Sequence, residues 1–209
     1  MDELVLDLER TKKDSKNFIL KEAFKLFTVK NFEKVTLADI ESKTNFCRGT
    51  ILYHIKNKEN LFINVINEFF FSSLNLYYPI SSNKVQSVKE YIRLKRNHLS
   101  SIDLWFYNEK ISINPSYAFL NILSQANQYY PQFTKKMSTF LKEDYDNWMR
   151  IIELGILTRE LKPTINPQKV VQVFQNLYIG SYLGSTFESN TSLSDHIESL
   201  HTIYEIIKL

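Results

Sequence analysis

Residues 48–58 combine small, polar and basic side chains in an order that suits the binding of a polyanion. Gly49 carries no side chain, so the backbone at this position can come close to a phosphate group. Thr50, Tyr53 and His54 follow within two helical turns, and each can form hydrogen bonds with phosphates or with the edges of bases. The segment therefore predicts a surface that binds nucleic acid.

Two basic residues flank this polar set. Arg48 begins the segment, where its guanidinium could reach a base edge. Lys58 lies in the first turn of the next helix, where its charge and the free backbone amides together favour a phosphate. The predicted DNA-binding residues are thus Arg48, Gly49, Thr50, Tyr53, His54 and Lys58.

Two short helices joined by a tight turn must position these residues. Thr36 can cap the first helix, because its side-chain oxygen can accept a free backbone N–H. Asn45 can end that helix, since Asn tolerates the left-handed conformation. The second helix begins at Cys47 or Arg48 and runs to about Ile55. A short second helix that opens with small and polar residues can enter the major groove, which is the arrangement of a helix-turn-helix.

The distribution of charge favours the same interpretation. The window from Arg10 to Asn60 holds twelve Lys and Arg against six Asp and Glu, whereas residues 61–209 hold fourteen against thirteen. A basic block on a nearly neutral body suggests a polyanion as partner. A solvated, Lys-rich helical surface would have the same charge, so charge alone does not decide between the two.

With these motifs in place, the sequence resembles the tetracycline-repressor (TetR) family of transcriptional regulators. The resemblance covers residues 15–66 and rests on the AFKLF stretch, on Thr36 and Ile40, and on the run GTILYHIKNKENL. It implies that the second short helix is the recognition helix. It also implies a larger C-terminal helical domain that binds a small ligand and dimerises through its last two long helices.

Three positions depart from the family pattern. Asn45 replaces the usual turn glycine, and Asn can adopt the same left-handed geometry. Glu41 stands where the family has a small Ala between the two helices, so its carboxylate must reach solvent or find a partner. Leu52 stands where many members have a Tyr that contacts DNA, which removes one hydroxyl contact.

We expect residues 1–60 to form the DNA-binding domain and residues 61–209 a helical bundle. The bundle region is dense in aromatic side chains, which can line a ligand pocket or simply fill the core. The residues predicted to line a pocket are Trp105, Phe106, Tyr129, Trp148 and Tyr178. Arg150 is the one full charge clearly among them, so the expected ligand is apolar or aromatic.

The last two predicted helices carry more apolar surface than a monomer would cover. Gly180 and Gly184 are four residues apart, a spacing that lets two helices approach closely. The residues predicted to lie in a dimer interface are Phe174, Leu177, Gly180, Leu183, Leu200 and Tyr204. A dimer would also place two recognition helices about one turn of DNA apart, as a palindrome requires. The alternative is that both helices pack within one subunit.

Composition argues against several other classes of protein. Only four Gly and five Pro occur in 209 residues, too few for the many tight turns of a sandwich or barrel, so we expect an all-α protein. Cys47 is the only cysteine, which fits a reducing compartment; at a helix start it acts either as a redox switch or as a small capping residue. The first ten residues lack the long apolar run of a signal peptide, and no segment predicts a membrane span, so we expect a cytoplasmic protein.

The sequence shows no arrangement typical of catalysis or of a resident cofactor. His196 and His201 are five residues apart rather than the three or four that place two ligands on one helical face, so we expect no metal. The leading hypothesis is a ligand-responsive homodimeric regulator, a repressor that binds a palindromic operator and is released by a small ligand. The alternatives are a DNA-binding regulator whose C-terminal domain only dimerises, without an inducer, and, more remotely, a helical-bundle enzyme.

Overall fold

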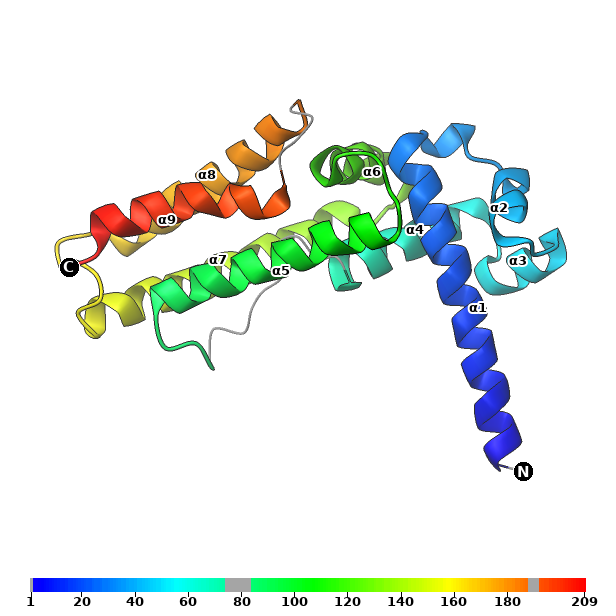
Figure 1. Cartoon of the computed structure of the whole chain (residues 1–209), viewed down its shortest axis with the longest axis horizontal. Helices are drawn as coiled ribbons and strands as arrows, with labels where there is room; N and C mark the ends of the chain where they lie inside the picture. The colour runs from blue at the N-terminus through cyan, green and yellow to red at the C-terminus, as the bar shows by residue number, and fades with distance from the viewer. Residues whose placement is uncertain (1, 74–83, 188–191) are drawn as a thin grey trace. The chain divides into compact units, whose positions relative to one another are not determined.

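The computed structural model of the chain describes residues 2–73, 84–187 and 192–209, and it confirms the all-α fold class (Figure 1). The long helices are α1 (Asp2–Val29), α2 (Leu37–Thr44), α3 (Arg48–Ile55), α4 (Lys58–Val65), α5 (Val88–Asn108), α6 (Pro115–Tyr129), α7 (Phe133–Leu157), α8 (Pro167–Ser185) and α9 (His196–Ile207). Short helical turns are η1 (Phe32–Lys34), the π-helix η2 (Ile66–Ser73), which continues α4, and η4 (Leu193–Asp195). In the described residues, β-type pairing is limited to one isolated bridge between Leu161 and Lys208.

The chain divides into two compact units. The first comprises residues 1–75 and 118–133, and the second residues 76–117 and 134–209. The first unit therefore includes most of α6, although more than forty residues of the second unit separate this helix from residue 75 in the sequence. The single boundary expected after residue 60 differs from this division, because sequence order alone does not show that α6 packs with the first helices.

Aromatic packing holds the first unit together. Phe27 of α1 is fully buried, and its ring centroid lies 5.0 Å from that of Phe62 of α4 in an edge-to-face arrangement. Phe32 of η1 stacks on Tyr129 of α6 with the centroids 4.1 Å apart. Aromatic pairs at these distances contribute about 0.5–1.5 kcal/mol each beyond the area they bury. The core formed in this way supports α2 and α3.

The second unit is a bundle of α5, α7, α8 and α9, in which α8 and α9 lie side by side (Figure 1). Gly155 allows α5 and α7 to approach closely, since a Cβ at this position would lie 2.7 Å from Cγ2 of Val88. Glu160 fastens three elements: its carboxylate accepts hydrogen bonds from the N–H of Val88 and of Lys89, and from the Tyr204 hydroxyl. Among the helices in the described part of the chain, none combines the length and the apolar character that crossing a membrane requires.

Two helices of the second unit are long and continuous. Helix α5 extends from Val88 to Asn108 without a break. Helix α7 continues past Gly155 to Leu157, and the left-handed residue that follows it is Arg159, with φ of 62°. Gly155 therefore serves close packing inside the helix rather than helix termination.

Candidate nucleic-acid interface and bundle cavity

The turn between α2 and α3 has the conformation predicted from its residue types. Thr36 and Asp39 form a reciprocal capping box at the start of α2, and Asn45 ends the helix in the left-handed conformation with φ of 58°. Hydrogen bonds from the backbone N–H and the hydroxyl of Thr36, together with the Lys30 ammonium, lower the pKa of Asp39 to about 2. A carboxylate that stays ionised at the positive end of α2 stabilises the helix start.

Helix α3 has one buried face and one exposed face. Ile51 and Ile55 are buried against the rest of the unit, with exposed fractions of 0% and 1%. Tyr53 is 66% exposed, and Gly49 is exposed with no atom within 4 Å of the position that a Cβ would occupy. Thr50 and His54 are half-buried. The predicted contact residues thus lie on α3, and the opposite face of this short helix is buried in the core.

Glu41 forms an ion pair with the first residue of α3. The Nε of Arg48 donates to Oε1 of Glu41 over 2.9 Å, and both side chains are partly exposed. This ion pair links α2 to the first residue of α3. Because one guanidinium N–H is held by Glu41, Arg48 can present only its remaining donors to a base edge.

Lys58 has a role that its position in the sequence did not reveal. Its ammonium lies 3.0 Å from the carbonyl oxygen of Phe32, 3.1 Å from that of Val35 and 3.4 Å from that of Glu33. It also lies 4.3 Å from the centroid of the Phe32 ring. Three carbonyls occupy the three N–H donors of the Lys58 ammonium, so this side chain stabilises the turn after α1, and its phosphate contact stays a prediction.

Cys47 precedes α3 as its capping residue. Its side chain makes no cap hydrogen bond to the backbone, and its Sγ lies 3.2 Å from Oγ1 of Thr50. This hydrogen bond is the main cause that lowers the pKa of the exposed Cys47 thiol. The contact also fixes the hydroxyl of Thr50 at the start of the recognition helix.

Residues 19–65 match the model of the bacterial regulatory proteins of the tetR family. This segment is a TetR-type DNA-binding domain. The match includes α2, the turn and α3, so α3 has the place of the second helix in a TetR-type helix-turn-helix.

Solved TetR structures share the fold over nearly the whole chain. A TetR regulator from Agrobacterium tumefaciens superposes with a TM-score of 0.68 at 13% identity, covering 95% of this chain and 100% of that one. A regulator from Cytophaga hutchinsonii gives 0.61 at 22% identity, with 95% and 97% covered. NalD, the secondary repressor of the MexAB-OprM multidrug efflux pump in Pseudomonas aeruginosa, gives 0.61 at 17% identity, with 96% and 98% covered. Among curated proteins, none matches this chain.

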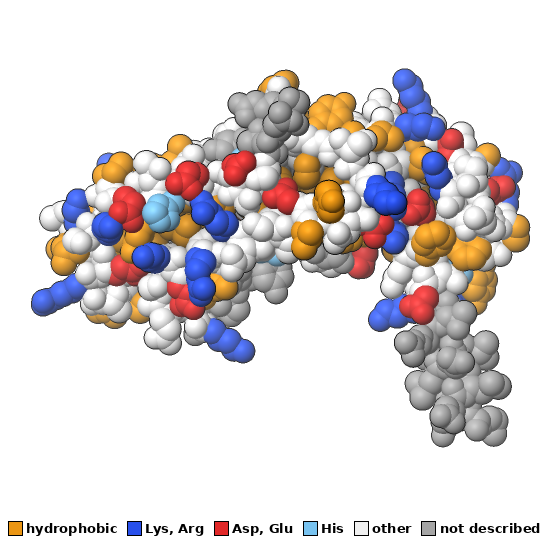
Figure 2. Space-filling view, in the orientation of Figure 1, with side chains coloured by type: hydrophobic (Ala, Val, Ile, Leu, Met, Phe, Trp, Pro, Cys, Tyr) orange, Lys and Arg blue, Asp and Glu red, His pale blue; other side chains and the backbone are white. Residues whose placement is uncertain are grey.

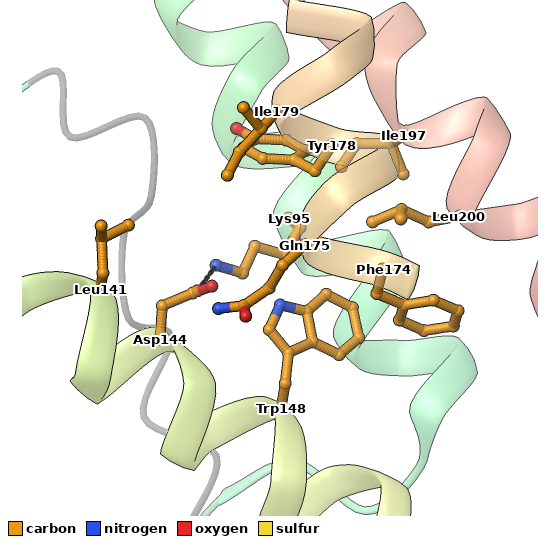
Figure 3. A pocket seen from close by; sticks show the side chains of 10 residues that line it. All are labelled: Lys95, Leu141, Asp144, Trp148, Phe174, Gln175, Tyr178, Ile179, Ile197 and Leu200. Carbon is orange, nitrogen blue, oxygen red and sulfur yellow. Dashed lines mark hydrogen bonds and ion pairs between the residues drawn. The ribbon is translucent and has the colours of Figure 1, made fainter. Parts of the chain in front are cut away.

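The second unit contains a small cavity between its helices (Figure 3). Its volume is about 20 Å³, which is room for one water molecule. Lys95 of α5 and Asp144 of α7 form a buried ion pair in its wall, with Nζ and Oδ1 2.5 Å apart. The remaining lining residues are Leu141, Trp148, Phe174, Gln175, Tyr178, Ile179, Ile197 and Leu200.

The residues predicted to line a ligand pocket lie in three places. Trp148 and Tyr178 line the cavity. Trp105 and Phe106 are outside its lining and contact each other edge to face, with their centroids 5.5 Å apart. Tyr129 belongs to the first unit, where its ring stacks on Phe32 and its hydroxyl donates to Glu33 over 2.7 Å. The sequence around a single aromatic residue such as Tyr129 does not indicate which of the two units the side chain packs in.

The residues predicted for a dimer interface separate into two groups. Phe174, Leu200 and Tyr204 are 0%, 1% and 6% exposed, so the structure places them in the core of the second unit rather than on a surface. Gly180 and Leu183 are exposed, and Leu177 is half-buried. Further exposed apolar residues lie on α8, namely Val173 and Ile179, and just after it, namely Phe187. Their spacing of three to four residues from the predicted ones was the available signal.

Within the described part of the chain, His, Cys, Asp and Glu side chains form no group of three that could hold a metal ion. Two serines and one histidine do meet in the second unit. The Oγ of Ser185 donates to Oγ of Ser116 over 2.7 Å, and both hydroxyls lie within 3.3 Å of Nε2 of His196. All three residues are buried, and the cluster joins the start of α6 to α8 and α9.

Proposed function

We propose that this TetR-family regulator binds a palindromic DNA operator as a homodimer, represses transcription there, and is released by a small ligand. The observation that carries the proposal is the surface of α3. Gly49 and Tyr53 are exposed on a helix whose opposite face, Ile51 and Ile55, is locked into the core of a helix-turn-helix. Small and hydrogen-bonding groups on a rigid, short helix suit the major groove.

The exposed surface of α8 supports the dimer. Val173, Leu177, Gly180, Leu183 and Phe187 recur every three or four residues, and four of the five are exposed. Nothing lies within 4 Å of an added Cβ at Gly180, so a second helix has room to approach there. A contiguous apolar stripe of this kind favours association with a second copy.

The cavity in the second unit is the candidate ligand site. Trp148, Phe174 and Tyr178 provide an aromatic wall, while Lys95 and Asp144 place a buried ion pair beside it. The site is therefore less purely apolar than its sequence suggests. A ligand larger than a water molecule must enlarge the cavity, and it would do so by moving α8 and α9 away from α5 and α7.

The small volume also favours a second candidate function, a DNA-binding regulator whose second unit only dimerises. The two differ in their response to ligands: in the first, a compound that binds beside Trp148 releases DNA, because two partners that favour different states weaken one another. In the second, no compound does so. In both, the chain acts by binding rather than by catalysis, and we place it in the cytoplasm, where an operator is accessible. NalD is a repressor, and this supports the same sign of regulation here.

Selection of DNA by the full-length protein tests the proposal. The parent protein is incubated with sheared DNA from its own genome and with a random duplex library, and the retained fragments are sequenced. We expect enrichment of one inverted repeat by the parent and no enrichment by the Thr50→Ala, Tyr53→Ala double variant. Retention without any shared sequence, or the same enriched repeat for the double variant, would contradict the assigned role of α3.

A further inference from the structure

A basic groove lies beside α3, and its three lysines come from outside the segment that matches the TetR model. It is an open cavity of about 370 Å³ in the first unit. Its lining consists of Lys12, Lys13 and Lys16 from α1 and of Tyr53 and His54 from α3. The family match covers residues 19–65 and so does not include the three lysines.

Helical spacing gathers the three lysines on one side of α1. Positions 12, 13 and 16 share a face, because residues three and four apart are neighbours on a helix. Asp14, the acidic residue between them in the sequence, lines a different groove together with Asn17, Phe18 and Lys21. Among the described side chains, the lining of the basic groove thus contains three cationic residues and no acidic one.

The side chains of α3 in the groove are in direct reach of this positive charge. The Nζ of Lys12 lies 4.9 Å from the centroid of the Tyr53 ring, a cation–π distance. Burial, and then the charges of Lys12 and Lys16, lower the pKa of His54. The lowered pKa favours the neutral ring of His54, which can accept as well as donate a hydrogen bond. The cationic side chains in the lining of the groove are the three lysines.

We propose that Lys12, Lys13 and Lys16 bind the phosphate backbone of the same DNA whose bases α3 reads. Tyr53 and His54 belong both to the exposed part of the recognition helix and to the groove, so a duplex held by α3 has phosphates beside these lysines. An open groove with three lysines in its lining can hold several phosphate oxygens, so it fits a polyanionic strand better than an apolar ligand. The inference rests on the proposed function, and it extends the DNA surface along the first helix by more than a turn.

Phosphate contacts determine affinity and its dependence on salt, but they carry no sequence information. Each neutralised phosphate adds about 0.9 to the slope of log affinity against log salt concentration, so three lysines add about 2.7 per subunit. Between about 50 mM and about 200 mM NaCl, the parent should therefore lose about 40-fold more affinity per subunit than a protein without these lysines.

The experiment compares three full-length proteins on one fluorescein-labelled random-sequence duplex over a series of NaCl concentrations. These are the parent, the variant Lys12→Ala, Lys13→Ala, Lys16→Ala, and a control that removes the same charge from exposed positions of the second unit. The control variant is Lys135→Ala, Lys142→Ala, Lys169→Ala. A fourth protein with Arg at positions 12, 13 and 16 tests for rescue, because Arg keeps the charge.

We expect the first variant to bind more weakly and with a slope lower by about 2.7 per subunit, while the control and the Arg protein match the parent. Its preference for the selected operator over random DNA should equal that of the parent. A parental slope in the first variant, or a loss of sequence preference together with affinity, would overturn the inference. If the parent itself shows no salt-dependent binding to DNA, the proposed function fails as well. If the lysine variant has the parental affinity and salt slope while Thr50→Ala, Tyr53→Ala abolishes binding, the groove is not a DNA contact but the proposed function stands.

Discussion

Replacing Lys58 by Met separates a structural role from a DNA contact. Methionine keeps the apolar stem of the side chain and removes the charge and the three hydrogen bonds to the carbonyls of Phe32, Glu33 and Val35. Hydrogen bonds to a charged group contribute about 1.5–3 kcal/mol each in favourable cases. A cation over an aromatic face adds about 0.5–1 kcal/mol at an exposed site.

These contributions are not additive, and the 3.4 Å contact is weak. Because Lys58 is only half-buried, water can satisfy part of what the carbonyls lose. We therefore expect Lys58→Met to lower the free energy of unfolding by about 2–4 kcal/mol. DNA affinity, measured well below the melting temperature, should keep its salt dependence.

Urea unfolding followed by circular dichroism measures the first quantity, and titration of a labelled duplex over a salt series measures the second. Lys34→Met is the matched control, since Lys34 is an exposed lysine of the same turn. A Lys58→Met protein with parental stability and a salt slope lower by about 0.9 would refute the reasoning. That result would mean that the ammonium leaves the carbonyls for a phosphate.

Three further substitutions give separate outcomes. Gly49→Ala should raise the free energy of unfolding by up to about 1 kcal/mol, because Ala is the better helix former and its Cβ has open space. The same change should weaken binding to the selected operator, and unchanged binding would show that the backbone of Gly49 does not approach DNA. Leu183→Arg should halve the mass observed in analytical ultracentrifugation at micromolar concentration. The control Leu157→Arg, at an exposed position at the end of α7, should leave this mass unchanged. A parent protein that sediments as a monomer would contradict the dimer. Asp144→Leu should lower the free energy of unfolding by about 3–5 kcal/mol, because it leaves Lys95 buried without its carboxylate partner. Adding Lys95→Met should restore most of this free energy in urea unfolding. An equal loss in the single and the double variant would show that the ion pair is not the cause.

The helix-turn-helix could be predicted from sequence because its determinants are local. Thr36 caps the first helix and Asn45 adopts the left-handed conformation, as their side chains dictate. Ile51 and Ile55 fall on the buried face because residues four apart lie together on a helix. Each of these features depends on residues within one or two helical turns, so spacing alone carries the information.

Features that depend on distant residues could not be predicted in this way. Lys58 is held by carbonyls more than twenty positions earlier, and Tyr129 packs on Phe32 almost a hundred positions earlier. The role of Gly155 likewise depends on a distant residue, because the side chain of Val88 on another helix leaves no room for a Cβ there. The partner of Glu41 was left open between solvent and a side chain, and the fold supplied Arg48.

The ratio of affinities for the selected operator and for random DNA tests the central claim most directly. We would measure it by competition titration at about 150 mM salt for the parent and for Thr50→Ala, Tyr53→Ala. Specific TetR-type recognition through α3 predicts a ratio of about 1,000 or more for the parent and a ratio near one for the double variant. Lys142→Ala, an exposed change in the second unit, should leave the parental ratio intact. A double variant that keeps the parental ratio would contradict the account, because sequence would then be read by a surface other than α3.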